Sequence, residues 1–194
     1  RCQLRNLGSI MPTKYSLLSN ARIALIPANG LGDGLIQMTL AYHLTKTGYH
    51  VTFFHDFLNE MKSWFPTVDI QPISPSTSLI PSLRDFDHVI FLDHHKADEM
   101  ASSLTHSFVL PKDSIDPKIS MLENIVNLGK NIFDIEMTKE NGMTIPPGLI
   151  LKKYNKRILI HPTSTDAVKN FPAKNFLSLA KKLKQDNLEP IFIL

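Results

Sequence analysis

The sequence predicts an α/β fold: a Rossmann-like parallel sheet, followed by the truncated start of a second Rossmann-like unit. Apolar runs typical of strands alternate with helical periodicity through residues 22–129. A stretch with two prolines and a glycine, 144–155, interrupts this pattern, and a strand–loop–helix cycle restarts after it. We therefore expect a first domain over 21–147 and the beginning of a second over 156–194. Residues 1–20 are expected to be a leader or an addition upstream of the native start.

The first element is the segment RIALIPANGLGDGLIQMT, 22–39, which predicts a strand, a tight turn and a helix. Its Gly30, Gly32 and Gly34 do not have the G-x-G-x-x-G spacing of a dinucleotide-binding loop. Asp33 lies among them, and its carboxylate would repel a pyrophosphate that the helix N-terminus otherwise attracts. The loop is therefore predicted to present a carboxylate at the strand end, where open α/β sheets bind ligands. The structural alternative is that Asp33 caps the helix.

The later elements of the first domain follow from short apolar runs and the residues that break them. The run 88–92 is continuously apolar, as is typical of a central strand in a parallel sheet. The Pro- and Ser-rich stretch 74–82 predicts a loop, and Gly129 predicts the end of a helix. The other expected elements are strands at 51–54, 68–73 and 107–110 and helices at 57–65 and 119–128.

The second domain is expected to begin with a strand at 157–161 and a polar loop at 162–170. Pro172 favours a helix start there, because its missing N–H costs little in a first turn. A strand at 190–194 follows. This strand–loop–helix–strand order is typical of the opening of a parallel α/β domain.

Composition limits the classes of function. The chain has 194 residues, 43% of them hydrophobic and 20% charged, which is typical of a globular protein. Its net charge of +3 includes no basic run of the kind that binds nucleic acid. A single cysteine, Cys2, excludes an internal disulfide framework and favours a reducing compartment. No apolar run reaches the length of a membrane span. The expected location is the cytoplasm.

Two segments resemble glycosyltransferase family 9, the heptosyltransferases of lipopolysaccharide assembly. They are LGDGLIQMT, 31–39, and HPTSTDAVKNFPAKNF, 161–176, and they lie in the right order at the starts of two domains. The resemblance covers about 21–194. The chain departs from the family at Pro27 and Ala28, where a Lys or Arg is usual, and at Thr39, where a Pro is usual. The first departure concerns recognition of an anionic acceptor.

The resemblance implies a GT-B-like fold and transfer of heptose or a related sugar, with inversion, from a nucleotide-sugar to a lipopolysaccharide or other glycan acceptor. ADP-heptose is the family's commonest donor. Asp33 is suited to act as general base on the acceptor hydroxyl. Lys169 is suited to the donor diphosphate, and Thr163, Ser164 and Thr165 supply hydroxyl donors beside a helix N-terminus. The family needs no metal or other cofactor.

The resemblance also has consequences for the arrangement and location of the protein. Asp33 and Lys169 are expected to face one cleft, because each follows the first strand of its domain. Contact with the cytoplasmic face of the inner membrane is expected to be peripheral at most. The 194 residues alone are expected to be inactive, because most of the donor-binding domain would follow Leu194.

Three other interpretations remain open. Asp93, His94 and His95 follow the apolar run 88–92, as in the Asp-His-His motif of metallophosphoesterases that bind divalent ions. Asp56 follows the second strand, where a Rossmann nucleotide-cofactor enzyme places a ribose-binding acid. The third is a non-catalytic module that keeps the fold and binds a nucleotide-sugar without turnover.

Overall fold

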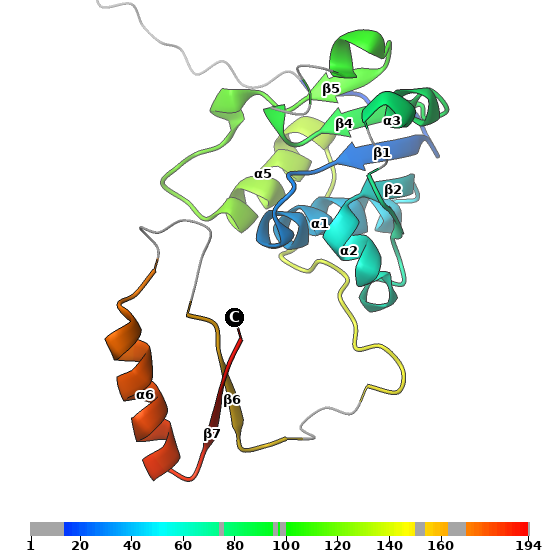
Figure 1. Cartoon of the computed structure of the whole chain (residues 1–194). Coiled ribbons are helices and arrows are strands. Elements are labelled where there is room, and N and C mark those ends of the chain that lie inside the picture. Colours follow the sequence, from blue (N-terminus) through cyan, green and yellow to red (C-terminus); the bar gives the residue numbers. More distant parts are fainter. Residues whose placement is uncertain are drawn as a thin grey trace, which may run out of the picture. The chain divides into compact units, whose positions relative to one another are not determined.

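The computed structural model divides the chain into two compact units, with the boundary between Pro146 and Pro147. Each unit has its own parallel sheet (Figure 1). The structure describes residues 14–73, 76–94, 97, 100–149, 154–162 and 170–193. The predicted α/β class, with a Rossmann-like first unit, is confirmed.

The sheet of the first unit has the strand order β3-β2-β1-β4-β5, with every neighbouring pair parallel. The chain builds outward from β1 to one edge and then returns to β1's other side with β4, so the order reverses between these two strands. In open α/β sheets this reversal creates a crevice at the carboxyl ends of the strands. The strands are β1 (Arg22–Ile26), β2 (His50–Phe54), β3 (Asp69–Gln71), β4 (His88–Phe91) and β5 (Ser107–Val109).

Helices cover both faces of this sheet (Figure 1). Side chains of β1 alternate between the two faces. Ile23 and Leu25 pack with α1 and α5, whereas Ala24 and Ile26 pack with α3. All four are fully buried, and burying one Ile or Leu side chain stabilises a fold by about 1.5–3 kcal/mol. The helices are α1 (Leu31–Lys46), α2 (Asp56–Glu60), α3 (Ser76–Leu83) and α5 (Met121–Phe133), with 3₁₀ turns at Lys62–Trp64, Ala101–Ser103 and Lys112–Ser114.

The structure corrects the loop predicted at 74–82, because α3 occupies most of it. Leu79 and Leu83 are one turn apart and buried in the cluster beneath β4. Proline is unfavourable at position 81 because it removes one backbone hydrogen bond of the helix, and the burial of these two leucines offsets this cost. The helix predicted at 57–65 is also divided, into α2 and the following 3₁₀ turn.

The predicted helix end at Gly129 is wrong. Helix α5 runs through Gly129 to Phe133, and Asp134 ends it in the left-handed conformation, with φ 57°. Tertiary packing explains the glycine. The Met137 side chain returns over the helix at this point, and a Cβ on residue 129 would lie 2.9 Å from Met137 Cγ. The glycine therefore permits close packing inside the helix rather than a turn at its end.

The segment that follows α5 is fixed to the first unit as far as Thr144. Backbone N–H of Thr138 donates to His43 Nε2 at 3.0 Å, and His43 Nδ1 donates to the carbonyl of Thr39. Further along, Asn141 Nδ2 donates to the carbonyl of Leu35, and Thr144 N–H donates to that of Trp64. The path between the two units is thus anchored on α1 before the boundary is reached.

The second unit contains β6 (Arg157–Ile160), α6 (Ala173–Gln185) and β7 (Glu189–Phe192). The two strands pair in parallel, and Pro172 is the N-cap of α6, as the sequence predicts for the start of this helix. Ile160 in β6 and Ala180 in α6 are buried, whereas Leu159 is 65% exposed. Helix α6 covers one face of this small sheet.

The segment before β1 is held to the first unit by His88. Leu18 N–H donates to His88 Nε2 at 3.2 Å, so the neutral ring carries its proton on Nδ1 and donates it to the Tyr15 hydroxyl at 2.9 Å. Burial lowers the pKa of His88; the Asp87 carboxylate opposes this shift and His106 adds to it. Protonation would cost the ring its bond to Leu18.

We expect His88 to make the protein less stable as the pH falls. The unfolded chain binds this proton at about pH 6.5, whereas the folded protein resists it to lower pH. Between the pKa of His88 in the unfolded chain and its lower pKa in the folded protein, the unfolded state binds more protons. The contribution of His88 to stability is therefore fully present above about pH 6.5 and is lost as the pH falls below it. Urea midpoints at pH 7.5 and 5.5 should differ less in His88→Gln than in the wild type. Equal differences would contradict this, since the other histidines are common to both proteins.

Candidate functional site

Asp33 lies in the first turn of α1, just beyond the carboxyl end of β1. The N-cap of the helix is Gly30, not Asp33, and no side chain caps this end. The Asp33 carboxylate is exposed, and its Oδ2 approaches Gly30 so closely that a Cβ there would lie 2.9 Å away. The negative charge is still favoured near the positive end of the helix dipole. The carboxylate is therefore available to a ligand, as the sequence predicts.

A pocket of about 250 Å³ opens beside Asp33 at the carboxyl ends of β1, β4 and β5. This is the point where the strand order reverses, the usual ligand position in an open α/β sheet. Asp93 and His94, which follow β4, supply further polar groups to the wall. The remaining wall is mostly apolar. It comes from the segments after β1, β4 and β5, from α1 and α5, and from the residue after the 3₁₀ turn at Lys112–Ser114: Ala28, Leu92, Leu110, Gln37, Met121, Ile125 and Ile115.

Gln37 fixes the path of the chain into the pocket. Its side chain is 6% exposed, and its Oε1 accepts the backbone N–H of Ala28 at 2.9 Å. The loop after β1 is thereby tied to the second turn of α1. Sequence reasoning missed this residue, because a glutamine on a helix gives no signal of its own. Glycosyltransferase family 9, which the sequence resembles, usually has a basic residue near Ala28. In this chain Ala28 has no charged side chain, and its backbone N–H is already bonded to Gln37.

The metal-binding and ribose-binding interpretations gain little from the described residues. Asp93 and His94 line the pocket, whereas His95 lies outside the described residues. No cluster of three or more His, Cys, Asp or Glu suited to a metal ion occurs in the described part of the chain. The Asp56 carboxylate accepts the backbone N–H of Ile73 at 2.7 Å, which gives it a structural role after β2.

The predicted donor-binding residues cannot be placed. Thr163, Ser164, Thr165 and Lys169 all lie outside the described residues. The elements that flank them are those the sequence predicts, since β6 ends at Ile160 and α6 begins directly after Pro172. Their roles, and the expectation that Asp33 and Lys169 face one cleft, stay predictions.

Charge is divided unequally between the two units. Residues 147–194 contain nine Lys and Arg against three Asp and Glu, whereas residues 1–146 contain twelve against fifteen. The second unit is therefore basic and the first is mildly acidic. A diphosphate would be attracted to the second unit, and the pocket beside Asp33 lies in the first.

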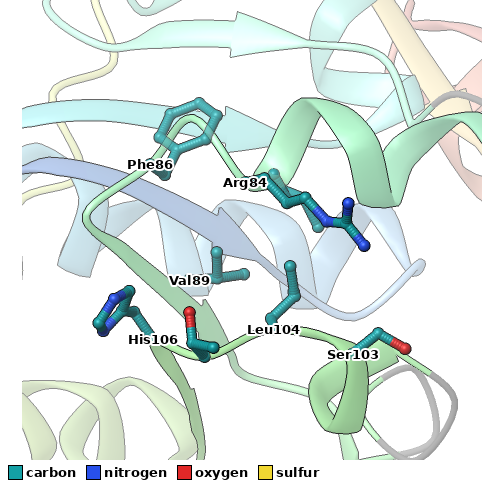
Figure 2. A pocket seen from close by; sticks show the side chains of 8 residues that line it. Arg84, Phe86, Val89, Ser103, Leu104 and His106 are labelled. Carbon is teal, nitrogen blue, oxygen red and sulfur yellow. The ribbon is translucent and has the colours of Figure 1, made fainter.

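A larger cavity, of about 350 Å³, lies at the amino ends of β4 and β5, on the opposite edge of the sheet from the pocket beside Asp33 (Figure 2). Leu83, Val89 and Leu104 form its apolar part. Its two basic side chains, Arg84 and His106, lie toward opposite sides in Figure 2 and do not converge on one point. Ligands of open α/β sheets usually bind at the carboxyl ends of the strands, so the pocket beside Asp33 is the candidate site.

Solved structures of glycosyltransferases are among those with a similar fold. A family 9 glycosyl transferase from Veillonella parvula has a TM-score of 0.62 at 18% identity, over 91% of this chain and 63% of its own. For Escherichia coli ADP-heptose lipopolysaccharide heptosyltransferase II the TM-score is 0.59 and the identity 16%. The match covers 88% of this chain and 63% of that protein's chain. For Escherichia coli heptosyltransferase WaaC with ADP the TM-score is 0.61 and the identity 14%. The match covers 88% of this chain and 67% of that protein's chain. Neither a protein-family model nor a curated protein matches the sequence.

At these identities the likeness establishes the fold. The chain spans 63% of the length of the first two structures and has the architecture of the heptosyltransferases over that part. The resemblance drawn from the two sequence motifs is thus confirmed for the fold. None of the described helices has the length and hydropathy that a bilayer-spanning segment requires.

His55, at the end of β2, is a second residue that sequence reasoning missed. Its ring is 1% exposed and lies against Gly34, so closely that a Cβ on residue 34 would overlap it. The same Cβ would lie 3.2 Å from Leu58 Cδ1. The available signal was a histidine directly after an apolar strand, opposite a glycine-rich loop. Gly34 is thus required by packing rather than by turn conformation.

Gly34→Ala and Gly32→Ala should have opposite effects on stability. An added Cβ at Gly34 meets the buried His55 ring, and such overpacking typically costs about 1–3 kcal/mol. Gly32 has nothing within 4 Å of its Cβ position, so alanine there should stabilise the helix by up to about 1 kcal/mol. Urea denaturation of both variants measures this. Equal changes in unfolding free energy would refute the packing role of Gly34.

Proposed function

We propose that this protein is a glycosyltransferase that moves a sugar from a nucleotide-sugar to an acceptor hydroxyl with inversion, and that Asp33 is its general base. The observation that carries the proposal is the exposed Asp33 carboxylate on a pocket at the strand-order reversal. The pocket is large enough for a sugar residue. Its apolar wall suits the nonpolar face of a sugar or its carrier.

In this mechanism the acceptor hydroxyl lies in the pocket beside Asp33. As its oxygen attacks the anomeric carbon, the carboxylate takes the hydroxyl proton, and the bond from that carbon to the diphosphate breaks. The nucleoside diphosphate leaves with the bonding electrons, and the proton stays on Asp33. Attack from the face opposite the leaving group inverts the anomeric centre. A carboxylate of ordinary basicity suffices, because proton transfer accompanies attack.

The donor belongs to the second unit in this proposal. The excess of basic residues there would attract a diphosphate, and Lys169 would supply a point charge to it. Thr163, Ser164 and Thr165 would donate hydrogen bonds before the N-terminus of α6. The solved structures of similar fold include a transferase with ADP, which supports an ADP-linked donor such as ADP-heptose. We propose a glycolipid or glycan acceptor and a cytoplasmic location with at most peripheral membrane contact.

Asp33→Asn should abolish most transfer in the full-length protein while leaving donor binding nearly unchanged. The amide keeps the shape of the side chain but cannot take the hydroxyl proton, and loss of a general base typically costs about 10²–10⁴ in rate. Transfer rates and calorimetric titration with a nucleotide-sugar measure the two effects. Normal turnover in this variant would refute the proposal. Donor binding without transfer in the wild type would instead favour a binding module.

Lys169→Ala is the matched test on the donor side. It should weaken nucleotide-sugar affinity as well as rate, because the diphosphate is charged before and during the reaction. The same titration and rate assays distinguish it from Asp33→Asn, which should change the rate alone. Unchanged affinity for the nucleotide-sugar would remove Lys169 from the donor site.

A further inference from the structure

We propose that His55 is a positioning residue that holds the Asp33 loop in its working geometry. The inference rests on the proposed function of Asp33, but the contacts that carry it do not. His55 comes from the end of β2, the strand beside β1, so it reaches the glycine loop from a separate element. At 1% exposure it cannot contact a substrate itself.

The hydrogen bonds of His55 assign different tasks to its two ring nitrogens. Backbone N–H of Leu58 donates to Nδ1 at 3.4 Å, which makes His55 the side-chain cap of α2. Nδ1 therefore carries no proton in the neutral ring, and the proton is on Nε2. From Nε2 the ring donates to the carbonyl oxygen of Gly30 at 3.3 Å.

Gly30 is the N-cap of α1, so its carbonyl lies where the loop after β1 becomes the helix that carries Asp33. The Gly30 oxygen also accepts the N–H of Gly34 at 2.8 Å, the first hydrogen bond of α1. His55 thus binds the same oxygen that closes the turn around Asp33. Its ring fills the space over Gly34 at the same time. Asp33 Oδ2 lies against Gly30 from within the turn, so a shift of Gly30 would move the carboxylate.

The ring itself is held in place. It stacks on Phe53, with the planes 5° apart and the centroids 6.2 Å apart, and it lies 6.1 Å from the Phe57 ring. A fixed ring with a directed donor is what an active site requires of the groups that support its reacting residues. The capping of α2 alone requires only the acceptor nitrogen, and asparagine could supply that.

Two variants separate positioning from capping. His55→Asn keeps an acceptor near Nδ1, and asparagine is a good N-cap, but it cannot reach Gly30 and leaves space over Gly34. His55→Gln places an amide N–H near the position of Nε2 and loses the cap. We expect His55→Asn to lower kcat about 10–100-fold with donor affinity unchanged, because small misplacements of reacting groups have effects of this size. His55→Gln should stay within about fivefold of the wild type.

Hydrogen exchange of the 194-residue chain tests the geometry without any activity. The Gly34 amide should exchange at least tenfold faster in His55→Asn than in the wild type, and nearly normally in His55→Gln. If both variants exchange like the wild type, the inference is wrong, whatever the enzyme does. Equal loss of kcat in the two variants, following their loss of stability, would also overturn it. If exchange behaves as expected and the wild type transfers no sugar, it is the proposed function that fails.

Discussion

The burial of β1 on both faces is the constraint on which the rest of the first unit depends. Ile23 to Ile26 are all fully buried, with alternate side chains in the two clusters that α1, α5 and α3 complete. A strand of this kind must lie at the centre of a parallel sheet, because only there are both faces covered. The carboxyl end of β1 then lies between β2 and β4. The chain runs from β1 toward one edge of the sheet through β2 and toward the other edge through β4, so a crevice opens at this end.

This central position determines which residues can form the turn between β1 and α1. The chain must leave β1 at a crowded point between β2 and β4, so the turn into α1 uses small residues. Gly34 admits the ring of His55, and Gly30 admits the carboxylate of Asp33. Both contacts would be lost with side chains at these positions. In dinucleotide-binding Rossmann folds, glycines at this turn allow a pyrophosphate to approach the backbone. In this protein, Gly30 and Gly34 allow side chains of the protein itself to approach.

Helix caps and buried histidines fix the elements of the first unit. Ser120 and Glu123 form a capping box at the start of α5, the helix that supplies Met121 and Ile125 to the pocket wall. Hydrogen bonds from Lys139 and Ser120 lower the pKa of Glu123 to about 2. His43, His55 and His88 each accept a backbone N–H on one ring nitrogen. These rings join segments that are distant in sequence and need a defined tautomer to do so.

Local periodicity, breakers and residue type were enough to predict the strand positions and an exposed carboxylate in the turn after the first strand. The sequence did not reveal α3, because the burial of Leu79 and Leu83 beneath β4 is a tertiary effect that overcomes a helix-breaking composition. It misread Gly129, whose reason is the distant Met137. Only the tertiary structure brought His55 and Gln37 to the loop, since neither contact follows from spacing along the chain.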